Sequence, residues 1–357
     1  MQGLESLIGE AQRMLRICNA CRYCEGYCAV FPALERRLDF GEGDVHYLAS
    51  LCHNCGSCLY ACQYAPPHEF QLNFPRMLAE VRGATYRKYA FPHFFAALFL
   101  RNGLAAALIT ALSLALLFLL VDRTAGGSFY DAMPHSLMAG LFGVASLLIL
   151  VPLVVGAVRF SRDMNERGSG GMGEATSDAL TLKYLDGGGE GCTYPDQQPS
   201  FARRRLHHLT FYGFALCFAA TCVGTFYHYV LGWPAPYAIF SLPVLLGTVG
   251  GVGLLIGPAG LLYLRARRDP DLGDAKQDGM DIAFIALLFL TSATGLALLA
   301  LRDIRAIAPL LAIQLGVVLA LFVTLPYGKF VHAVYRVAAL VRYHAERKRP
   351  PPALGGE

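Results

Sequence analysis

Eight cysteines near the N-terminus are the residues whose type and spacing most clearly indicate chemistry. They form two runs with the same C-x2-C-x2-C-x3-C spacing, at positions 18–28 and 52–62. Thiolates at this spacing wrap a four-iron cluster, and in two-cluster ferredoxins the fourth cysteine of each run binds the other cluster. We therefore predict two [4Fe–4S] clusters. The first is expected on Cys18, Cys21, Cys24 and Cys62, and the second on Cys52, Cys55, Cys58 and Cys28.

Zinc sites and disulfides are the alternative explanations for these cysteines. Structural zinc usually takes two separated C-x2-C pairs and does not need three evenly spaced cysteines plus a fourth, given twice. Disulfides would suit a secreted domain. Residues 1–17, however, mix Glu and Arg with apolar residues and lack the continuous apolar core of a signal peptide. The pattern favours iron–sulfur clusters over both alternatives.

The segments around the cysteines have helical periodicity. Apolar residues recur at helical spacing over residues 4–16, and Ala29–Arg37 and Glu42–Leu51 are also helical rather than alternating in pattern. No hairpin signal such as Asn-Gly occurs between the runs. The head, residues 1–90, is therefore predicted to be an α-helical ferredoxin domain.

The rest of the chain has the composition of a membrane protein. The 357 residues are 55% hydrophobic and 16% charged, with a mean hydropathy of +0.43, whereas soluble domains are about 25% charged. Phe91–Leu100 is too short to span a bilayer and is expected to lie at the interface. Six spans without Asp, Glu, Lys or Arg in their interiors are predicted. They cover about 103–121, 134–158, 206–231, 238–264, 282–301 and 306–328.

Basic residues in the loops predict the orientation, because Lys and Arg accumulate on the cytoplasmic side. Loop 159–205 contains seven, loop 265–280 four and the tail after Gly328 six, against one, none and two in the three opposite loops. The head and both termini are therefore expected in the cytoplasm. The predicted all-α architecture is thus a ferredoxin head, a cytochrome b-like transmembrane domain over 91–345 and a cytoplasmic tail, 346–357. Nucleic-acid binding is not expected at a net charge of +4 without a basic run interleaved with aromatics.

Histidines near the ends of the spans occur at matching depths. His135 and His228 lie at the outer ends of the second and third spans. His207 and His208 open the third span on the inner side, and His332 follows the inner end of the sixth. Paired imidazoles at one depth on neighbouring helices are what a bis-histidine b-type haem needs. We therefore predict an outer haem b on the first pair and an inner haem b on His332 with His207 or His208.

The choice between the two adjacent histidines stays open at this point. His207 is closer in helical phase to His228 than His208 is, but two haems can face different helices. The alternative to haem ligation is that interfacial histidines anchor at the lipid headgroups, which is the expectation for His93.

Small residues of the third span have two possible roles. Gly213 and Gly224 would let a macrocycle approach the backbone, although small residues also serve ordinary helix packing. Cys217 and Cys222 are expected to be small core residues.

The long inner loop is rich in glycine, over residues 168–173 and 185–191. No strand precedes these glycines and no βαβ unit surrounds them, so a nucleotide fingerprint is disfavoured. We expect a flexible loop that lies on the head or on a partner. Cys192 could be a ligand or a redox thiol, but with eight ligands supplied it is expected to be a free cysteine.

Three further motifs carry a resemblance that covers nearly the whole chain. They are YLDGGGEGCTYP at 184–195, RRRLHHLTFYGF at 203–214 and KFVH at 329–332. Together with the two cysteine runs, they make the chain resemble the tricarballylate- or citrate-utilisation protein B family. Its membrane part is also similar to the haem-bearing gamma subunit of respiratory nitrate reductase.

The resemblance implies a location in the bacterial inner membrane, a partner and an electron route. The partner is a cytoplasmic FAD-dependent tricarballylate dehydrogenase, whose reduced flavin this protein reoxidises while passing electrons to the membrane quinone. Within this chain we find no nucleophile–base pair or carboxylate dyad that would oxidise a carboxylic acid. The expected role is therefore that of a redox subunit, with the substrate chemistry on the partner.

Other functions remain open from the sequence. The spans could merely anchor a ferredoxin that has no haem, or the chain could be a subunit like nitrate reductase gamma or heterodisulfide reductase. A transporter would need substrate-binding charges at mid-membrane, and the predicted spans have none.

Overall fold

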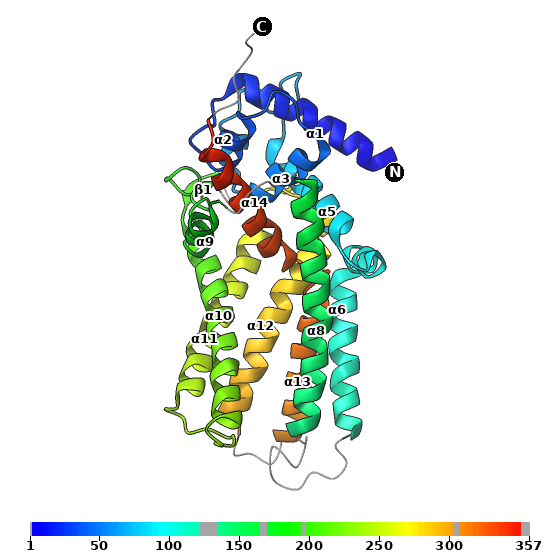
Figure 1. Ribbon diagram of the computed structural model, residues 1–357, viewed down its shortest axis with the longest axis vertical. Helices are drawn as coiled ribbons and strands as arrows, with labels where there is room; N and C mark the ends of the chain where they lie inside the picture. Colours follow the sequence, from blue (N-terminus) through cyan, green and yellow to red (C-terminus); the bar gives the residue numbers. More distant parts are fainter. Residues whose placement is uncertain (1, 122–134, 165–169, 194–196, 303–306, 351–357) are drawn as a thin grey trace.

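The chain folds into a helical head at one end of a bundle of long helices (Figure 1). This computed structural model describes residues 2–121, 135–164, 170–193, 197–302 and 307–350. In the described residues the strands are two short ones, β1 (Cys192–Thr193) and β2 (Pro199–Ser200), which pair antiparallel. The prediction of an all-α chain is confirmed. The N-terminal and C-terminal helices, α1 and α14, both lie at the head end.

Five helices build the head. They are α1 (Gln2–Cys21), α2 (Val30–Leu34), α3 (Glu42–Leu51), α4 (Ser57–Tyr60) and α5 (Phe74–Tyr89). The helix expected over 4–16 extends to Cys21, so the first two cysteines of the first run lie one turn apart at its end. Helix α3 has the predicted bounds, and its apolar residues Val45, Leu48 and Leu51 are buried in the head.

The long apolar helices follow. They are α6 (His93–Val121), α8 (His135–Asp163), α10 (Ala202–Tyr229), α11 (Leu242–Ala266), α12 (Asp278–Ala300) and α13 (Ile307–Thr324). By length and composition four of them, α8, α10, α11 and α12, could cross a membrane. Helix α6 makes a fifth if its two parts, which meet at a bend of 102° after Phe99, form one span. The apolar part of α13, Pro309–Thr324, is shorter, so the predicted count of six is not confirmed.

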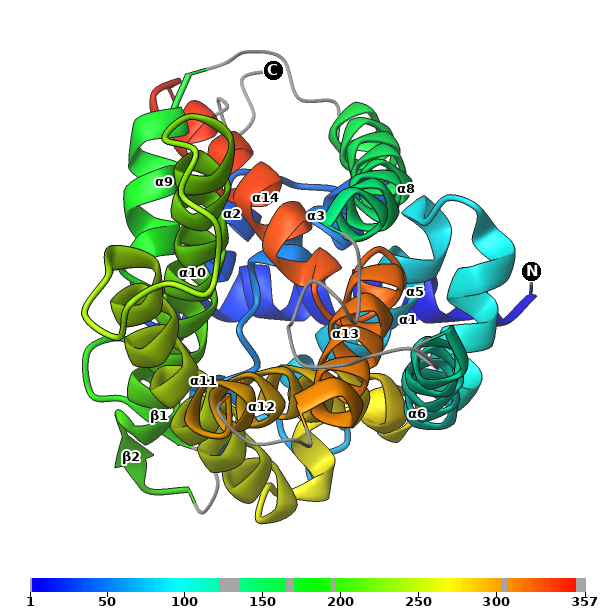
Figure 2. The same ribbon diagram turned by 90° about the horizontal axis from the view of Figure 1, so that it is seen from below.

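Close helix packing accounts for the small residues of α10. A Cβ on Gly213 would lie 2.8 Å from the carbonyl oxygen of Gly250 on α11, so Gly213 serves helix packing and not the approach of a macrocycle. Cys217 packs at the same contact, as predicted for a small core residue. Cys222 is exposed on α10, so the prediction of a core position is wrong for this residue. Figure 2 shows the order α10, α11, α12, α13 and α6 along the bundle, and successive helices in this order are in contact.

The basic loops and the C-terminal helix meet the head. Helix α9 (Met172–Leu180) packs on α14 (Val331–Arg347), and α14 packs on α3. Two short 3₁₀ helices, η1 (Pro270–Leu272) and η2 (Ala275–Gln277), precede α12, and η1 packs on α5. All three segments predicted to be cytoplasmic therefore lie at the head end of the bundle (Figure 1). The opposite loop 122–133 lies outside the described residues.

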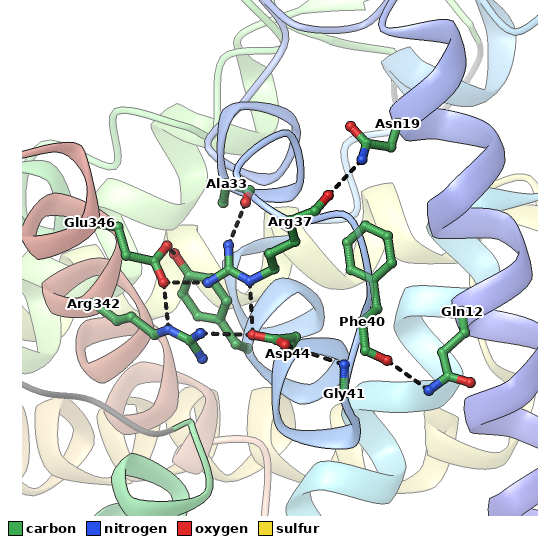
Figure 3. Close-up of polar contacts among 10 residues, drawn as sticks. Gln12, Asn19, Ala33, Arg37, Phe40, Gly41, Asp44, Arg342 and Glu346 are labelled. Atoms are coloured by element: carbon green, nitrogen blue, oxygen red, sulfur yellow. Dashed lines mark hydrogen bonds and ion pairs between the residues drawn. The ribbon is translucent and has the colours of Figure 1, made fainter. Parts of the chain in front are cut away.

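An ion-pair network fixes α14 to the head (Figure 3). The Asp44 carboxylate accepts hydrogen bonds from Arg37 at 2.8 Å and from Arg342 at 2.7 Å. Glu346 pairs with the same two arginines and accepts a hydrogen bond from the Tyr47 hydroxyl at 3.2 Å. Both guanidinium groups also lie over the Tyr47 ring, 4.9 and 4.3 Å from its centroid. These shared contacts hold together elements that are about 300 residues apart in the chain.

Candidate functional site

The four cysteines predicted for the first cluster come together. Cys18 and Cys21 lie at the end of α1, and they line a cavity of about 280 Å³ with Cys24 and Cys62. Burial raises the pKa of Cys24 to about 12, with further contributions from Cys62 and Cys21. Burial and the same neighbours also raise the pKa of Cys18. Cys62, from the second run, thus lies with the first run, as crossed ligation requires.

The four cysteines predicted for the second cluster also come together. Cys28, Cys52, Cys55 and Cys58 line a smaller cavity of about 20 Å³. Burial raises the pKa of Cys28, and the nearby thiols of Cys55 and Cys52 raise it further. Cys58 lines both cavities, so the two sets adjoin.

Each set has the donors that a four-iron cluster uses. Thiolates are its usual ligands, and metal binding deprotonates thiols even where burial alone would keep them protonated. Among the residues that the structure describes, no three His, Cys, Asp or Glu side chains form a site for a single metal ion. The donor chemistry of both sets therefore fits iron–sulfur ligation, and the two sets adjoin.

Three arginines from three helices hold the loop of the second run. Arg336 on α14 donates to the carbonyl oxygen of Cys52 at 2.7 Å, and Arg82 on α5 donates to the same oxygen at 3.1 Å. Arg203 on α10 donates to the carbonyl oxygen of Asn54 at 2.8 Å. The spacing of the cysteines gives no sign of these contacts. Arg203 attaches the second run to α10, one of the helices long and apolar enough to cross a membrane, while Arg82 and Arg336 attach it to α5 and to α14.

Two of the predicted inner histidines face each other. The ring centroids of His207 on α10 and His332 on α14 are 6.2 Å apart, and the ring planes cross at 81°. Two imidazoles that bind one metal through bonds of about 2 Å place their centres roughly 6 Å apart. Nδ1 of His332 pairs with the carbonyl oxygen of Lys329, which leaves Nε2 available as a ligand. Burial lowers the pKa of His332, with further contributions from Arg336 and His207, so the ring is neutral.

The adjacent His208 points elsewhere. Its Nε2 donates to the carbonyl oxygen of Thr181 at 3.2 Å, and its ring lies against Tyr212. The structure therefore brings together His207 and His332 but not His208.

His53 is a residue whose importance the sequence reasoning missed. It lies between Cys52 and Cys55, and burial lowers its pKa, followed by the charges of Arg336 and Arg203 and by His207 and His332. Arg203 and Arg336, which donate to carbonyl oxygens of the second run, are each four residues from a histidine of the pair, so this loop lies beside the pair. The sequence signal that could have identified His53 is its position between two predicted cluster ligands, Cys52 and Cys55.

The outer histidine pair is described only in part. His228 lies near the end of α10, with its ring 5.0 Å from that of Tyr229. His135 begins α8, but its side chain lies outside the described residues. The outer haem therefore stays a prediction. His93 is exposed at the start of α6, where an interfacial anchor is expected.

The glycine-rich segment covers the second run. A Cβ on Gly56, which has a φ of +90°, would lie 2.8 Å from the carbonyl oxygen of Thr193. Cys192 is fully buried against Cys55, and their hydrogen bond lowers the pKa of Cys55 and raises that of Cys192. Of the two predicted places for this loop, the head or a partner, its described residues lie on the head. The sequence reasoning missed that Cys192 touches a predicted ligand.

The architecture is that of a protein with a helical, ferredoxin-like head joined to helices long and apolar enough to cross a membrane. Residues 11–90 match the family described as "Citrate utilization protein B Fer4-like domain", and residues 91–353 match "Citrate utilization protein B". The chain belongs to the citrate utilization protein B family. It is 52% identical to the citrate utilization protein B of Escherichia coli over 98% of each chain. No solved structure matches it.

Proposed function

We propose that the protein carries electrons from two [4Fe–4S] clusters in its head to haem b in the membrane and on to a quinone. The observation that carries this proposal is that the second cysteine loop lies beside the histidine pair, because Arg203 and Arg336, each four residues from a histidine of the pair, donate hydrogen bonds to its carbonyl oxygens. His53 lies in that loop, and His207 and His332 are among the groups that shift its pKa. A centre on the second cysteine set would thus be next to one on the histidines, as electron transfer between them needs.

The residues of this chain would hold and separate the redox groups. Clusters and haem accept one electron at a time, whereas a flavin releases two, so one-electron centres in series suit a flavin donor. The crossed cysteine sets would fix the two clusters side by side. His207 and His332 would bind the inner haem, with the Lys329 carbonyl orienting the His332 ring. His228 and His135 would bind an outer haem.

The proposed partner is a cytoplasmic FAD-dependent dehydrogenase that oxidises tricarballylate or a similar tricarboxylate such as citrate. The relative's name, which concerns citrate utilisation, supports a tricarboxylate. The sequence offers no acid–base pair suited to that oxidation, which supports a separate dehydrogenase. The role of this chain is then that of a redox subunit.

The proposed location is the bacterial inner membrane, with the head in the cytoplasm. Four helices long enough to span a membrane support membrane insertion. The three segments with the most Lys and Arg lie at the head end, which supports a cytoplasmic head.

Spectra of the detergent-purified full-length protein test the proposal. We expect a b-type α-band in the reduced-minus-oxidised spectrum that quinone addition reverses. His207→Ala should lose at least the inner-haem part of the band, and the matched control His208→Ala should keep it. A wild-type protein with clusters but no α-band would contradict the haem step and indicate a membrane-anchored ferredoxin instead.

A further inference from the structure

We propose that Arg82, Arg203 and Arg336 form a cationic collar that makes the second cysteine set the higher-potential, electron-accepting centre of the head. This inference rests on the proposed function, since it concerns clusters held by the two sets. It adds a direction of transfer and assigns it to three residues that are not ligands.

The collar is defined by hydrogen bonds to the last turn of α3 and to the loop that follows it. Arg336 donates to the carbonyl oxygens of Ser50 at 3.2 Å and Cys52 at 2.7 Å. Arg82 donates to those of Ala49 at 3.3 Å and Cys52 at 3.1 Å. The third member, Arg203, donates to the Asn54 carbonyl oxygen at 2.8 Å, so the residues on both sides of His53 accept hydrogen bonds from the collar.

Two charges of this collar, those of Arg82 and Arg336, are poorly screened. The side chain of Arg82 is buried, with 7% of its surface exposed, and that of Arg336 is half-buried. Among the described residues, no carboxylate forms an ion pair with either of these two arginines. Arg37 and Arg342, by contrast, are offset by Asp44 and Glu346. Uncompensated charge in a medium of low dielectric acts strongly on a neighbouring charge.

Positive charge near a cluster favours its reduced form, because reduction adds an electron. Net charge, hydrogen bonding and solvent exposure are the variables that set cluster potentials. A collar of buried and half-buried arginines therefore raises the potential of a cluster on the second set.

The first set has no such collar in the described structure. The one arginine that lines its cavity is Arg22, which is exposed and donates to the carbonyl oxygen of Asn19 at 3.0 Å. Water and salt screen an exposed charge. Because only the second set has this collar among the described residues, a cluster on the second set has the higher reduction potential and accepts the electron from a cluster on the first.

The collar also lies on the path toward the histidines. Arg203 precedes His207 by four residues on α10, and Arg336 follows His332 by four residues on α14. Residues four apart share one face of a helix. The same two helices thus present a histidine and an arginine to the second set, so the centre that accepts the electron is the one beside the histidine pair.

An EPR-monitored redox titration of the anaerobically purified full-length protein tests the collar. Cys18→Ser, which removes a ligand of the first cluster only, assigns the signals. In the wild type we expect the second cluster to be reduced at the higher potential. Arg336→Gln and Arg203→Gln keep an amide donor but remove the charge. Each should lower the equilibrium constant for reduction of the second cluster about tenfold, which is a fall of about 59 mV in its one-electron potential. The same constant for the first cluster should change less than threefold.

Two further variants separate charge from shape. Arg336→Lys keeps the charge and should restore most of the shift that Arg336→Gln causes. Arg347→Gln removes an exposed charge from the same helix and should leave both potentials unchanged. Intact clusters whose potentials do not respond to the glutamine variants, or shift equally, would overturn the collar but not the proposed function. A wild-type protein without iron–sulfur signals would overturn the proposed function itself.

Discussion

The two cysteine runs have the same spacing but different surroundings. The first set lines a cavity at the surface of the head, beside Tyr23, whose side chain is 70% exposed. The second set lies under the glycine-rich segment and is held by arginines of α5, α10 and α14. Spacing thus defines which cysteines can bind a cluster, whereas tertiary contacts define what that cluster can exchange electrons with. The half-buried first set, at the surface of the head, suits a soluble donor, and the covered second set suits the membrane part.

The largest expected effect comes from breaking the crossed arrangement of ligands. Cys62→Ser should remove the first cluster although Cys62 belongs to the second run, because it lies with Cys18, Cys21 and Cys24. Iron and acid-labile sulfide should fall by about half, as one of two four-iron clusters is lost. EPR of the remaining cluster should match that of Cys18→Ser.

The reciprocal variant is the control. Cys28→Ser should leave the spectrum that Cys52→Ser leaves. A Cys62→Ser protein that resembles Cys52→Ser instead would contradict crossed ligation and leave each run with its own cluster.

A smaller effect is expected where α14 is fixed to the head. Asp44→Asn removes the carboxylate that Arg37 and Arg342 share, and hydrogen bonds to charged groups contribute about 2 kcal/mol. Local opening of α14 should become easier by that amount, which hydrogen exchange of the α14 amides measures. Because α14 carries Arg336, the second cluster should become less stable in air while the first changes little. Asp39→Asn, at an exposed ion pair, is the control.

Acid should also make local opening of α14 easier in the wild type, because it protonates Asp44. Burial alone would raise the pKa of Asp44, but Arg37 and Arg342 outweigh it and hold the pKa below the usual 3.8. A carboxyl with a lowered folded-state pKa contributes stability above its unfolded value and loses it as the pH falls through the folded value. Protection of α14 should therefore be complete at pH 6 and decline below about pH 4. Asp44→Asn should lack this part of the pH dependence, and an identical decline in that variant would contradict the assignment.

The smallest effect concerns the cover of the second set. Gly56→Ala puts a Cβ against the Thr193 carbonyl at a positive φ, whereas Gly189 has a φ of +107° with nothing within 4 Å of its Cβ. Both substitutions carry the backbone cost of about 1–2 kcal/mol, but only the first should displace the glycine-rich segment. Loss of the second cluster in air should be several-fold faster in Gly56→Ala than in Gly189→Ala. Equal rates would indicate that the segment does not protect the cluster.

Local patterns account for what the sequence predicts well. Helix α3 was predictable to the residue because its signal lies within Glu42–Leu51 itself. Membrane helices follow from long apolar stretches, but α13 is shorter than predicted since hydropathy does not show where a helix ends. Cys222 was misplaced because the face that α10 turns to α11 is set by close packing at Gly213.

The parts of the site that the sequence did not predict depend on contacts between distant segments. Arg82, Arg203 and Arg336 converge on one loop from positions more than a hundred residues apart, and no local pattern marks them as a group. Likewise, Cys192 meets Cys55 only after the glycine-rich segment folds over the head. His207 was separated from His208 by tertiary contacts, since helical phase alone left the choice open.

Iron and acid-labile sulfide content of the anaerobically purified wild-type protein tests the central claim most directly, because the whole electron route begins at two clusters in the head. The account predicts about eight iron atoms and about eight sulfides per chain, besides haem iron, from two four-iron clusters. A protein that contains zinc in place of iron, or no acid-labile sulfide, would contradict it.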